Sequence, residues 1–345
     1  MIKAQISNLE TYKKYLSVIN NIEAFLIKRQ FLKLDLPVLL PALIPESYLE
    51  VFETEYRYFE NRQKRYLAPS PELLIKRLLV EGIGDCYYLG KAFRNSEPTS
   101  SKHEGEFTML ELYKVGATYM DMAEITLNLM QTLSQISNAN SQHPTSNIIQ
   151  YHGMSIDLNR WEKLTVAEAF ERYANISAEV LFDHDKFLST AKQKGYQIEL
   201  STKPLQRYSY EELWSQIYTN EIEHQLGSNG YPTLLTDYPI EFAALSKPNL
   251  DGKTAQRFEF YIAGVELGNC YSELTDWKLQ EERLKREEQE RTISGKIPYN
   301  PDIEFINVLK KGLPDCAGMA IGVERLAMIF TNVDSINSLK LISIE

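Results

Sequence analysis

Apolar residues recur at helical spacing near the start of the chain and then give way to an extended segment. A spacing of three or four residues predicts a helix over residues 12–28. Its apolar positions are Tyr12, Tyr15, Ile19, Ile22 and Phe25. The sequence FLKLDLPVLLP that follows contains Pro37 and Pro41, which cannot donate a backbone hydrogen bond. We therefore expect this segment at a sheet edge or at an interface.

A well-marked helix is predicted over residues 70–82. Ser70 suits the N-cap, Pro71 the first turn and Gly82 the C-terminal cap. The highly charged residues 276–296 are predicted to form a solvated helix. Ion pairs four residues apart support it, including Glu281–Lys285 and Glu287–Arg291.

Three segments have the pattern of β-strands. Residues 87–93 and 107–113 are expected to form two strands, and residues 258–271 a hairpin with Ala263 and Gly264 at its turn. Helices mixed with hairpin-like strands, and little alternation of the βαβ kind, favour an α+β fold.

One domain over residues 1–345 is the expected organisation. Residues 136–150 are polar and turn-rich, and residues 160–230 are predicted to be mostly helical. Because they carry no chemistry that we can name, residues 136–230 are expected to be an inserted or peripheral region.

Composition and charge limit the class of protein. The chain has 345 residues, of which 43% are hydrophobic, so a large core can be buried. Its formal charge of -10 disfavours tight non-specific binding to nucleic acid. The three cysteines, Cys86, Cys270 and Cys316, are widely spaced, which argues against a disulfide framework or a zinc ribbon. With no signal peptide or membrane span in the sequence, we expect a cytoplasmic, reduced protein.

The side chains of the predicted strand at 107–113 alternate between its two faces. Phe107, Glu111 and Tyr113 share one side, while Leu110 and Leu112 lie on the other. The second set is an apolar packing face. The first set is either the polar face of a half-exposed strand or a pocket floor, with an aromatic plane for stacking and oxygen atoms for an ammonium group.

Two carboxylates meet on the hairpin. With a two-residue turn, Glu259 and Glu266 point to the same side of the sheet and repel each other unless a cation lies between them. Magnesium is a candidate because it takes hard oxygen ligands and is often shared with phosphates, and two exposed glutamates are the alternative. Asn269 and Glu273 have the opposite parity and join this side only if the chain bulges near Gly268.

Four further residues are candidates for a site. Arg325 follows Gly322 and precedes an apolar run, which places a guanidinium near the start of a buried helix. Arg94 and His103 flank a polar loop between two strands, and each is a surface residue or a phosphate ligand. Glu72 lies in the first turn of its helix, where the helix dipole alone would favour it. The sequence has no GxxxxGK[ST], GxGxxG, HExxH or GxSxG motif.

Taken together, these segments resemble the catalytic domain of class II aminoacyl-tRNA synthetases, specifically the lysyl branch. FRNS…HEGEFTMLELY, ending at residue 113, is similar to the family's second motif, and GMAIGVERLAMIF at 318–330 to its third. Pro37, which closes the long helix and strand, looks like the first motif, which forms the dimer interface. PTLLTDYPIEFAAL and ELGNCYSELTD also match lysyl-type patterns. The resemblance implies an antiparallel sheet flanked by helices and a homodimer.

The resemblance also implies an ATP-dependent ligase that forms an aminoacyl-adenylate and uses magnesium. The nucleotide roles fall on Arg94 for the α-phosphate, Arg325 and His103 for the γ-phosphate, Phe107 for adenine, and Glu259 and Glu266 for magnesium. Glu72 would bind the α-amino group of the amino acid. The residues around its distal amine would be Glu111, Tyr113, Asn269 and Glu273.

The position of Pro37 narrows the resemblance. It comes too early in the sequence for the anticodon-binding domain that precedes this motif in lysyl-tRNA synthetases, so we expect no such domain. The chain is therefore most similar to the short paralogues that ligate β-lysine to a lysine of elongation factor P. Ala320 agrees with this assignment, because lysyl-tRNA synthetases have glycine there, and an extra methyl group can disfavour one substrate by about 1–3 kcal/mol.

Three positions depart from the family pattern. Ser96 replaces the glutamate of the second motif, and Glu97 is expected to take over its role in ATP binding. Glu104 replaces an asparagine, and Glu324 replaces an aspartate beside Arg325. Added carboxylates near a triphosphate weaken its binding unless a metal ion or an arginine offsets them.

Three functions therefore remain open. The first is activation of lysine or β-lysine and its transfer to a lysine amine of elongation factor P. The second is a tRNA-charging enzyme without an anticodon domain, which the acidic composition disfavours. The third is a catalytically silent regulator, for which Ser96 and Glu104 are the only support.

Overall fold

A computed structural model describes residues 2–46, 48–96, 100–138, 146–198, 206–293, 295–299 and 301–344. Its centre is an eight-stranded sheet in the order β10-β11-β12-β13-β14-β7-β6-β2. The pairs at its two ends, β10–β11 and β2–β6, are parallel, and the pairs between them are antiparallel. The strands are β2 (Leu32–Leu34), β6 (Cys86–Phe93), β7 (Glu106–Val115), β10 (Glu162–Thr165), β11 (Thr233–Pro239), β12 (Thr254–Ile262), β13 (Val265–Ser272) and β14 (Cys316–Gly322). The predicted α+β fold with an antiparallel sheet is confirmed.

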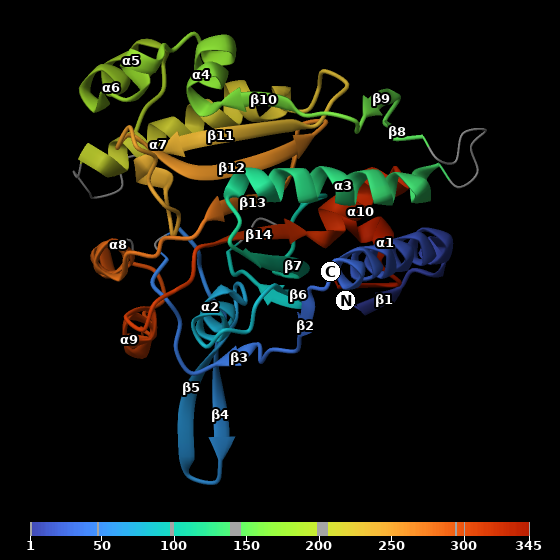
Figure 1. Cartoon of the computed structure of the whole chain (residues 1–345), viewed down its shortest axis with the longest axis horizontal. Coiled ribbons are helices and arrows are strands. Elements are labelled where there is room, and N and C mark those ends of the chain that lie inside the picture. Colours follow the sequence, from blue (N-terminus) through green and yellow to red (C-terminus); the bar gives the residue numbers. More distant parts are fainter. Residues whose placement is uncertain are drawn as a thin grey trace.

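One face of the sheet is covered by three helices, α1 (Leu9–Lys28), α3 (Tyr119–Ser137) and α10 (Val323–Thr331) (Figure 1). Their apolar sides pack with Leu110 and Leu112 in the largest hydrophobic cluster. The opposite face is flanked by α2 (Glu72–Val80), α8 (Trp277–Ile293) and α9 (Ile303–Leu309). The polar side of β7 is therefore turned away from the main core, as alternation along the strand requires.

A second hydrophobic cluster lies beyond β10 and β11 and accounts for most of the predicted peripheral region. Its helices are α4 (Val166–Ala174), α5 (Ala178–Leu181), α6 (His184–Gln193) and α7 (Gln206–Ile217). The mostly helical prediction for residues 160–230 is correct, although it missed β10. In the predicted loop at 136–150, α3 continues to Ser137, β8 (Ile148–Tyr151) pairs with β9 (Met154–Asp157), and residues 139–145 lie outside the described residues.

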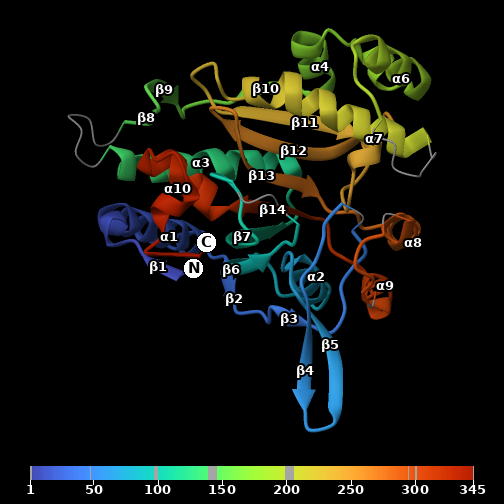
Figure 2. The same cartoon turned by 180° about the vertical axis from the view of Figure 1, so that it is seen from behind.

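A small sheet of β3 (Leu39–Leu40), β5 (Asn61–Leu67) and β4 (Glu53–Tyr58) projects from the body, and its β4–β5 hairpin is the longest extension in Figure 1. The two ends of the chain pair through β1 (Ile2–Ala4) and β15 (Ile342–Ile344), and both views show them side by side (Figure 2). Short helical turns complete the fold: η1 (Ile6–Asn8), η2 (Tyr218–Ile222), η3 (Glu223–Gln225), η4 (Ile240–Phe242) and η5 (Ile336–Leu339). Within the described residues, no helix is long and apolar enough to span a membrane.

Two local predictions need correction. Pro71, not Ser70, occupies the N-cap position of α2, and its carbonyl accepts hydrogen bonds from the amides of Leu74 and Ile75. The predicted Glu287–Arg291 pair is also wrong. Arg291 is 4% exposed and pairs with Glu50 at 2.6 Å, because α8 packs on the chain that precedes β4. The Glu281–Lys285 pair is confirmed at 3.1 Å.

The hairpin of β12 and β13 follows its prediction closely. Ala263 and Gly264 have φ angles of 50° and 69°, as a two-residue turn of this hand requires. Glu266 lies opposite Tyr261, and the register then shifts so that Leu267 is an extra residue. This bulge places Asn269 opposite Glu259, which is the condition under which the sequence predicted that Asn269 and Glu273 join that face.

Candidate active site

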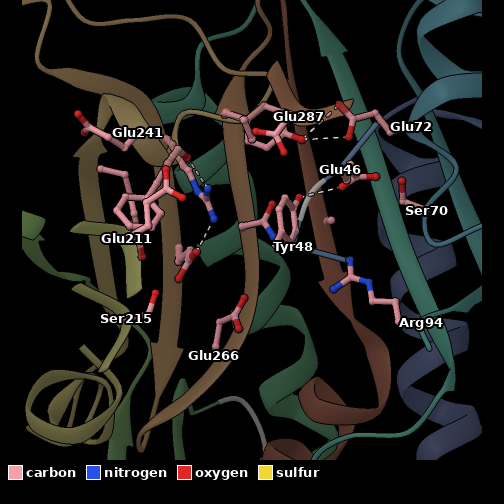
Figure 3. A pocket seen from close by; sticks show the side chains of 18 of the residues that line it. Glu46, Tyr48, Ser70, Glu72, Arg94, Glu211, Ser215, Glu241, Glu266 and Glu287 are labelled. Atoms are coloured by element: carbon pink, nitrogen blue, oxygen red, sulfur yellow. Dashed lines mark hydrogen bonds and ion pairs between the residues drawn. The ribbon is translucent and has the colours of Figure 1, made fainter. Parts of the chain in front are cut away.

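A cavity of about 900 Å³ lies on the face of the sheet opposite α1, α3 and α10 (Figure 3). Side chains of β7, β12, β13 and β14 form its floor, and residues of α2, α7 and α8 contribute to its walls. Nine glutamates and two arginines line it, so its lining is strongly acidic. A smaller adjoining cavity of about 100 Å³ shares Arg94, Met109, Glu266, Asn269 and Ala320 with it.

The floor is built by strand register. Glu111 pairs with Ala320, Ala320 with Asn269, and Asn269 with Glu259, so four adjacent strands place these residues in one row. The next row contains Tyr113, Gly318, Tyr271 and Arg257. Of the two interpretations of the 107–113 strand, the pocket floor is the one that the structure bears out.

One end of the cavity, here called the carboxylate end, is formed by Glu72, Glu111, Tyr113, Asn269 and Ala320. Glu111 is 3% exposed and accepts a hydrogen bond of 2.8 Å from the Tyr113 hydroxyl. Burial, followed by repulsion from Glu72, raises the pKa of Glu111 well above its usual value. A cation entering this end would therefore meet a carboxyl group that ionises as it binds.

Lys76, a buried lysine behind the carboxylate end, was not among the predicted site residues. Its Nζ lies 2.5 Å from Glu72 Oε1 and 2.6 Å from Glu273 Oε2, and it is 2% exposed. Burial opposes its charge, but Glu273 and Glu72 raise its pKa above the ordinary value. Its spacing of four residues from Glu72 in a helix was the available signal.

Glu273 does not line the cavity; it is fully buried behind it and pairs with Lys76. Burial and Glu72 raise the pKa of Glu273 to about 8, although Lys76 opposes the shift. A β-carbon at Gly318 would lie 2.4 Å from Glu273 Oε1 and from Tyr113 Cε1, so only glycine fits between these two side chains. Tyr271, also missed, donates to both carboxylate oxygens of Glu72 at 3.1 and 3.2 Å.

The other end, here called the arginine end, consists of Arg94, His103, Phe107 and Arg325, which all line the smaller cavity. The Arg94 guanidinium carbon lies 5.4 Å from the centre of the Phe107 ring. Arg94 Nε is buried and has no hydrogen-bond partner in the described part of the chain, so it has a donor to offer. Arg325 donates to Glu266 Oε2 at 3.3 Å, and His103 Nδ1 lies 3.0 Å from Ser100 Oγ. Glu97 lies outside the described residues.

Glu259 and Glu266 both line the large cavity. Glu259 accepts a 2.6 Å bond from Arg257 Nη2 and a second bond from the Tyr261 hydroxyl. Burial, and then the charge of Glu259, raise the pKa of Glu266. Among the described residues no three His, Cys, Asp or Glu side chains form a metal-binding cluster. The pair suits an ion such as magnesium that takes its remaining ligands from phosphate and water.

Two of the residues that depart from the family pattern have protein partners. Glu104 forms an ion pair with Lys340, so its charge is compensated within the chain. Glu324 is 5% exposed and accepts from the Thr108 amide with both oxygens at 2.9 Å, which ties α10 to β7. Glu324 therefore has a structural role beside Arg325.

Comparison with known proteins agrees with this geometry. Residues 7–342 match the family model described as tRNA synthetases class II (D, K and N). The chain is 32% identical to a lysine–tRNA ligase of Clostridium perfringens and 31% identical to one of Helicobacter pylori, in each case over 95% of this chain and 62% of the relative. A lysine–tRNA ligase of Erwinia tasmaniensis is 32% identical over 94% of this chain and 61% of its own length. The chain thus spans about three fifths of the length of these relatives. The family match over nearly its whole length shows that the chain belongs to the class II tRNA synthetases of the D, K and N type.

Proposed function

We propose that this protein activates lysine or β-lysine with ATP as an aminoacyl-adenylate and transfers it to a lysine amine of elongation factor P. The observation that carries the proposal is the carboxylate end of the cavity. Glu72 and Glu111 line it, and Lys76 behind the wall pairs with both Glu72 and Glu273, so one internal cation serves three carboxylates. Three carboxylates with one internal cation leave an excess of negative charge, which suits the two ammonium groups of a diamino acid.

The arginine end supports binding of ATP beside that amino acid. Arg94 lines both cavities, so its guanidinium can contact a phosphate next to the substrate carboxylate. Arg325 and His103 would hold the outer phosphates, and Phe107 offers a ring for the base. Glu259 and Glu266 would hold a magnesium ion, which would neutralise charge on the phosphates.

The reaction requires alignment more than covalent catalysis. The substrate carboxylate, held with its amino group at Glu72, attacks the α-phosphorus, and pyrophosphate leaves. Arg94 would stabilise the charge that develops on the α-phosphate oxygens. Because the floor is a row across four hydrogen-bonded strands, the reacting groups are positioned by a rigid element.

Ala320 supports a choice between the lysine isomers. Its methyl group lies in the row between Glu111 and Asn269, where the backbone of the bound amino acid would pass. A methyl group there would disfavour one isomer by about 1–3 kcal/mol.

A homodimer is supported by apolar side chains exposed along α1 and the edge strand β2, such as Ile27 and Leu32.

The second candidate function, charging of tRNA, is favoured by the names of the relatives. One assay separates the two. Pyrophosphate exchange is measured with a panel of amino acids that includes both lysine isomers, and elongation factor P and tRNA are then offered as acceptors. Label on elongation factor P supports the proposal, and label on tRNA alone overturns it. Absence of exchange with every amino acid would indicate the silent regulator.

A further inference from the structure

A side cavity of about 280 Å³ opens beside the main one. The two share seven residues in their linings: Glu46, Tyr48, Glu72, Glu241, Ala244, Tyr271 and Glu287. Much of the remaining wall is apolar, and Arg283, Arg286 and Gln280 of α8 add polar groups to it. The apolar residues include Pro45, Ile240, Ala243, Leu245, Leu279 and Leu284. An apolar passage that ends at carboxylates matches a lysine side chain, which has a hydrocarbon stem and an ammonium head.

A buried amide points to an occupant of this cavity. Gln280 of α8 lines it and is 1% exposed, yet its Nε2 has no hydrogen-bond partner within the described residues. Leaving a buried donor unpaired costs about 1–3 kcal/mol. The backbone carbonyl of a lysine whose side chain enters the cavity would satisfy this donor.

Glu46 stands at the junction of the two cavities. Figure 3 shows it between Glu72 and Arg94, with Tyr48 donating to its carboxylate at 2.8 Å. Its backbone is held from both sides: its amide donates to the Tyr299 hydroxyl at 2.9 Å, and its carbonyl accepts from Arg291 at 3.2 Å. The carboxylate is therefore fixed near the place where the acyl group and the α-phosphate would meet.

Glu46, like Glu111, differs from four other cavity carboxylates in its charge partners. Glu72 pairs with Lys76, Glu259 with Arg257, Glu266 with Arg325 and Glu241 with His184. In the described part of the chain, Glu46 forms no ion pair. Burial in the cavity, followed by the charge of Glu72, raises the pKa of Glu46 to about 7. Tyr48 and Arg94 oppose this shift, and Glu287 adds to it.

We propose that the side cavity admits the lysine side chain of the acceptor and that Glu46 is the general base that removes a proton from its ammonium group. This inference rests on the proposed function. The ammonium gives one proton to Glu46, and the neutral amine forms a bond to the acyl carbon. The bond from that carbon to the phosphate oxygen then breaks. The second proton passes from the nitrogen to the departing phosphate, which leaves the amide, AMP and protonated Glu46.

The test is a single-turnover reaction on enzyme that already carries the lysyl-adenylate. Butylamine has the stem and ammonium of a lysine side chain, whereas hydroxylamine is already neutral at neutral pH and needs no base. We expect Glu46→Gln to slow transfer to butylamine by about 10²-fold or more, the usual contribution of a general base, and to retain transfer to hydroxylamine. Glu282→Gln, an exposed change on α8, is the matched control and should transfer to both amines normally.

The pH profile and a second variant complete the test. Transfer to butylamine should rise through about pH 7 in the unchanged protein and lose this inflection in Glu46→Gln. Gln280→Lys, which fills the side cavity with an ammonium, should block butylamine and spare hydroxylamine. Equal slowing with both amines, or normal butylamine transfer in both variants, would overturn the inference. Absence of pyrophosphate exchange in the unchanged protein would instead refute the proposed function.

Discussion

At the carboxylate end of the cavity, the internal cation Lys76 is buried behind the wall, and the carboxylates of Glu72 and Glu111 face inward. At the arginine end the arrangement is reversed: guanidinium groups face the cavity, and Arg94 retains an unpaired donor in the described part of the chain. The same sheet thus presents an excess of negative charge at the carboxylate end of the cavity and an excess of hydrogen-bond donors at the arginine end. This difference is what allows a diamino acid and a polyphosphate to bind side by side, each with its own complement.

The largest effect is expected on stability, from removing the buried cation Lys76. Lys76→Met would leave Glu72 and Glu273 without a counter-charge in a buried place, so we expect the free energy of unfolding to fall by about 3–5 kcal/mol. Urea denaturation measures this change. Adding Glu273→Gln to Lys76→Met should recover part of the loss, and a lack of recovery would show that packing, not charge, is responsible.

Removing Arg94 tests the other end. Arg94→Ala should lower the rate of pyrophosphate exchange by about 10²–10³-fold, because one oriented donor to the developing charge is lost. The melting temperature should change little, since the guanidinium makes few interactions with the protein. Arg57→Ala, on the exposed β4–β5 hairpin, is the control. An unchanged rate in Arg94→Ala would mean that the α-phosphate binds elsewhere.

A substitution of Glu111 tests whether the carboxylate end binds lysine independently of ATP. Glu111→Gln keeps the shape of the side chain and removes its charge, so we expect the lysine KM to rise by about 10- to 100-fold, the effect of one hydrogen bond to a charged group. The KM for ATP should stay constant, because Glu111 does not line the smaller cavity. A rise in both constants would contradict the separation of the two ends.

The last prediction concerns the pH dependence of lysine affinity. Burial raises the pKa of Glu273 to about 8 and also raises the pKa of Glu111, so both groups hold protons more tightly than ordinary carboxyls do. A diammonium ligand favours their ionised forms and must expel those protons. Lysine affinity should therefore rise from pH 6 to pH 8, by at most about tenfold per unit for each proton released. Calorimetry in buffers of different ionisation enthalpy counts these protons, and Glu273→Gln should release fewer.

Sequence patterns predicted the parts of the site that depend on neighbours along the chain. Strand alternation placed Glu111 and Tyr113 together, and turn chemistry set Glu259 beside Glu266, because both rules act over a few residues. The resemblance then connected these segments. It also allowed the site residues to be named before their geometry was known.

The missed residues are those whose neighbours are distant in sequence. Lys76 becomes a structural cation only because α2 packs beside Glu273, 197 positions later in the numbering. Gly318 is required only because the side chains of Tyr113 in β7 and of Glu273, just after β13, meet over it. Arg291 was misassigned for the same reason: a charged helix suggested solvent, and packing against the chain near Glu50 gave it a buried partner.

Leu267, the extra residue of β13, determines which face of the sheet each later side chain of the strand points to. With an uninterrupted ladder, Asn269 would lie opposite Phe258 and Tyr271 would face the hydrocarbon side, while Cys270 would enter the cavity. If Leu267 were instead paired within the ladder, opposite Phe260, the binding surface would become apolar without a change in any residue of the site, whereas deleting Leu267 would keep Asn269 opposite Glu259. The two faces of β13 are therefore set by the unpaired state of Leu267 and not by its side chain.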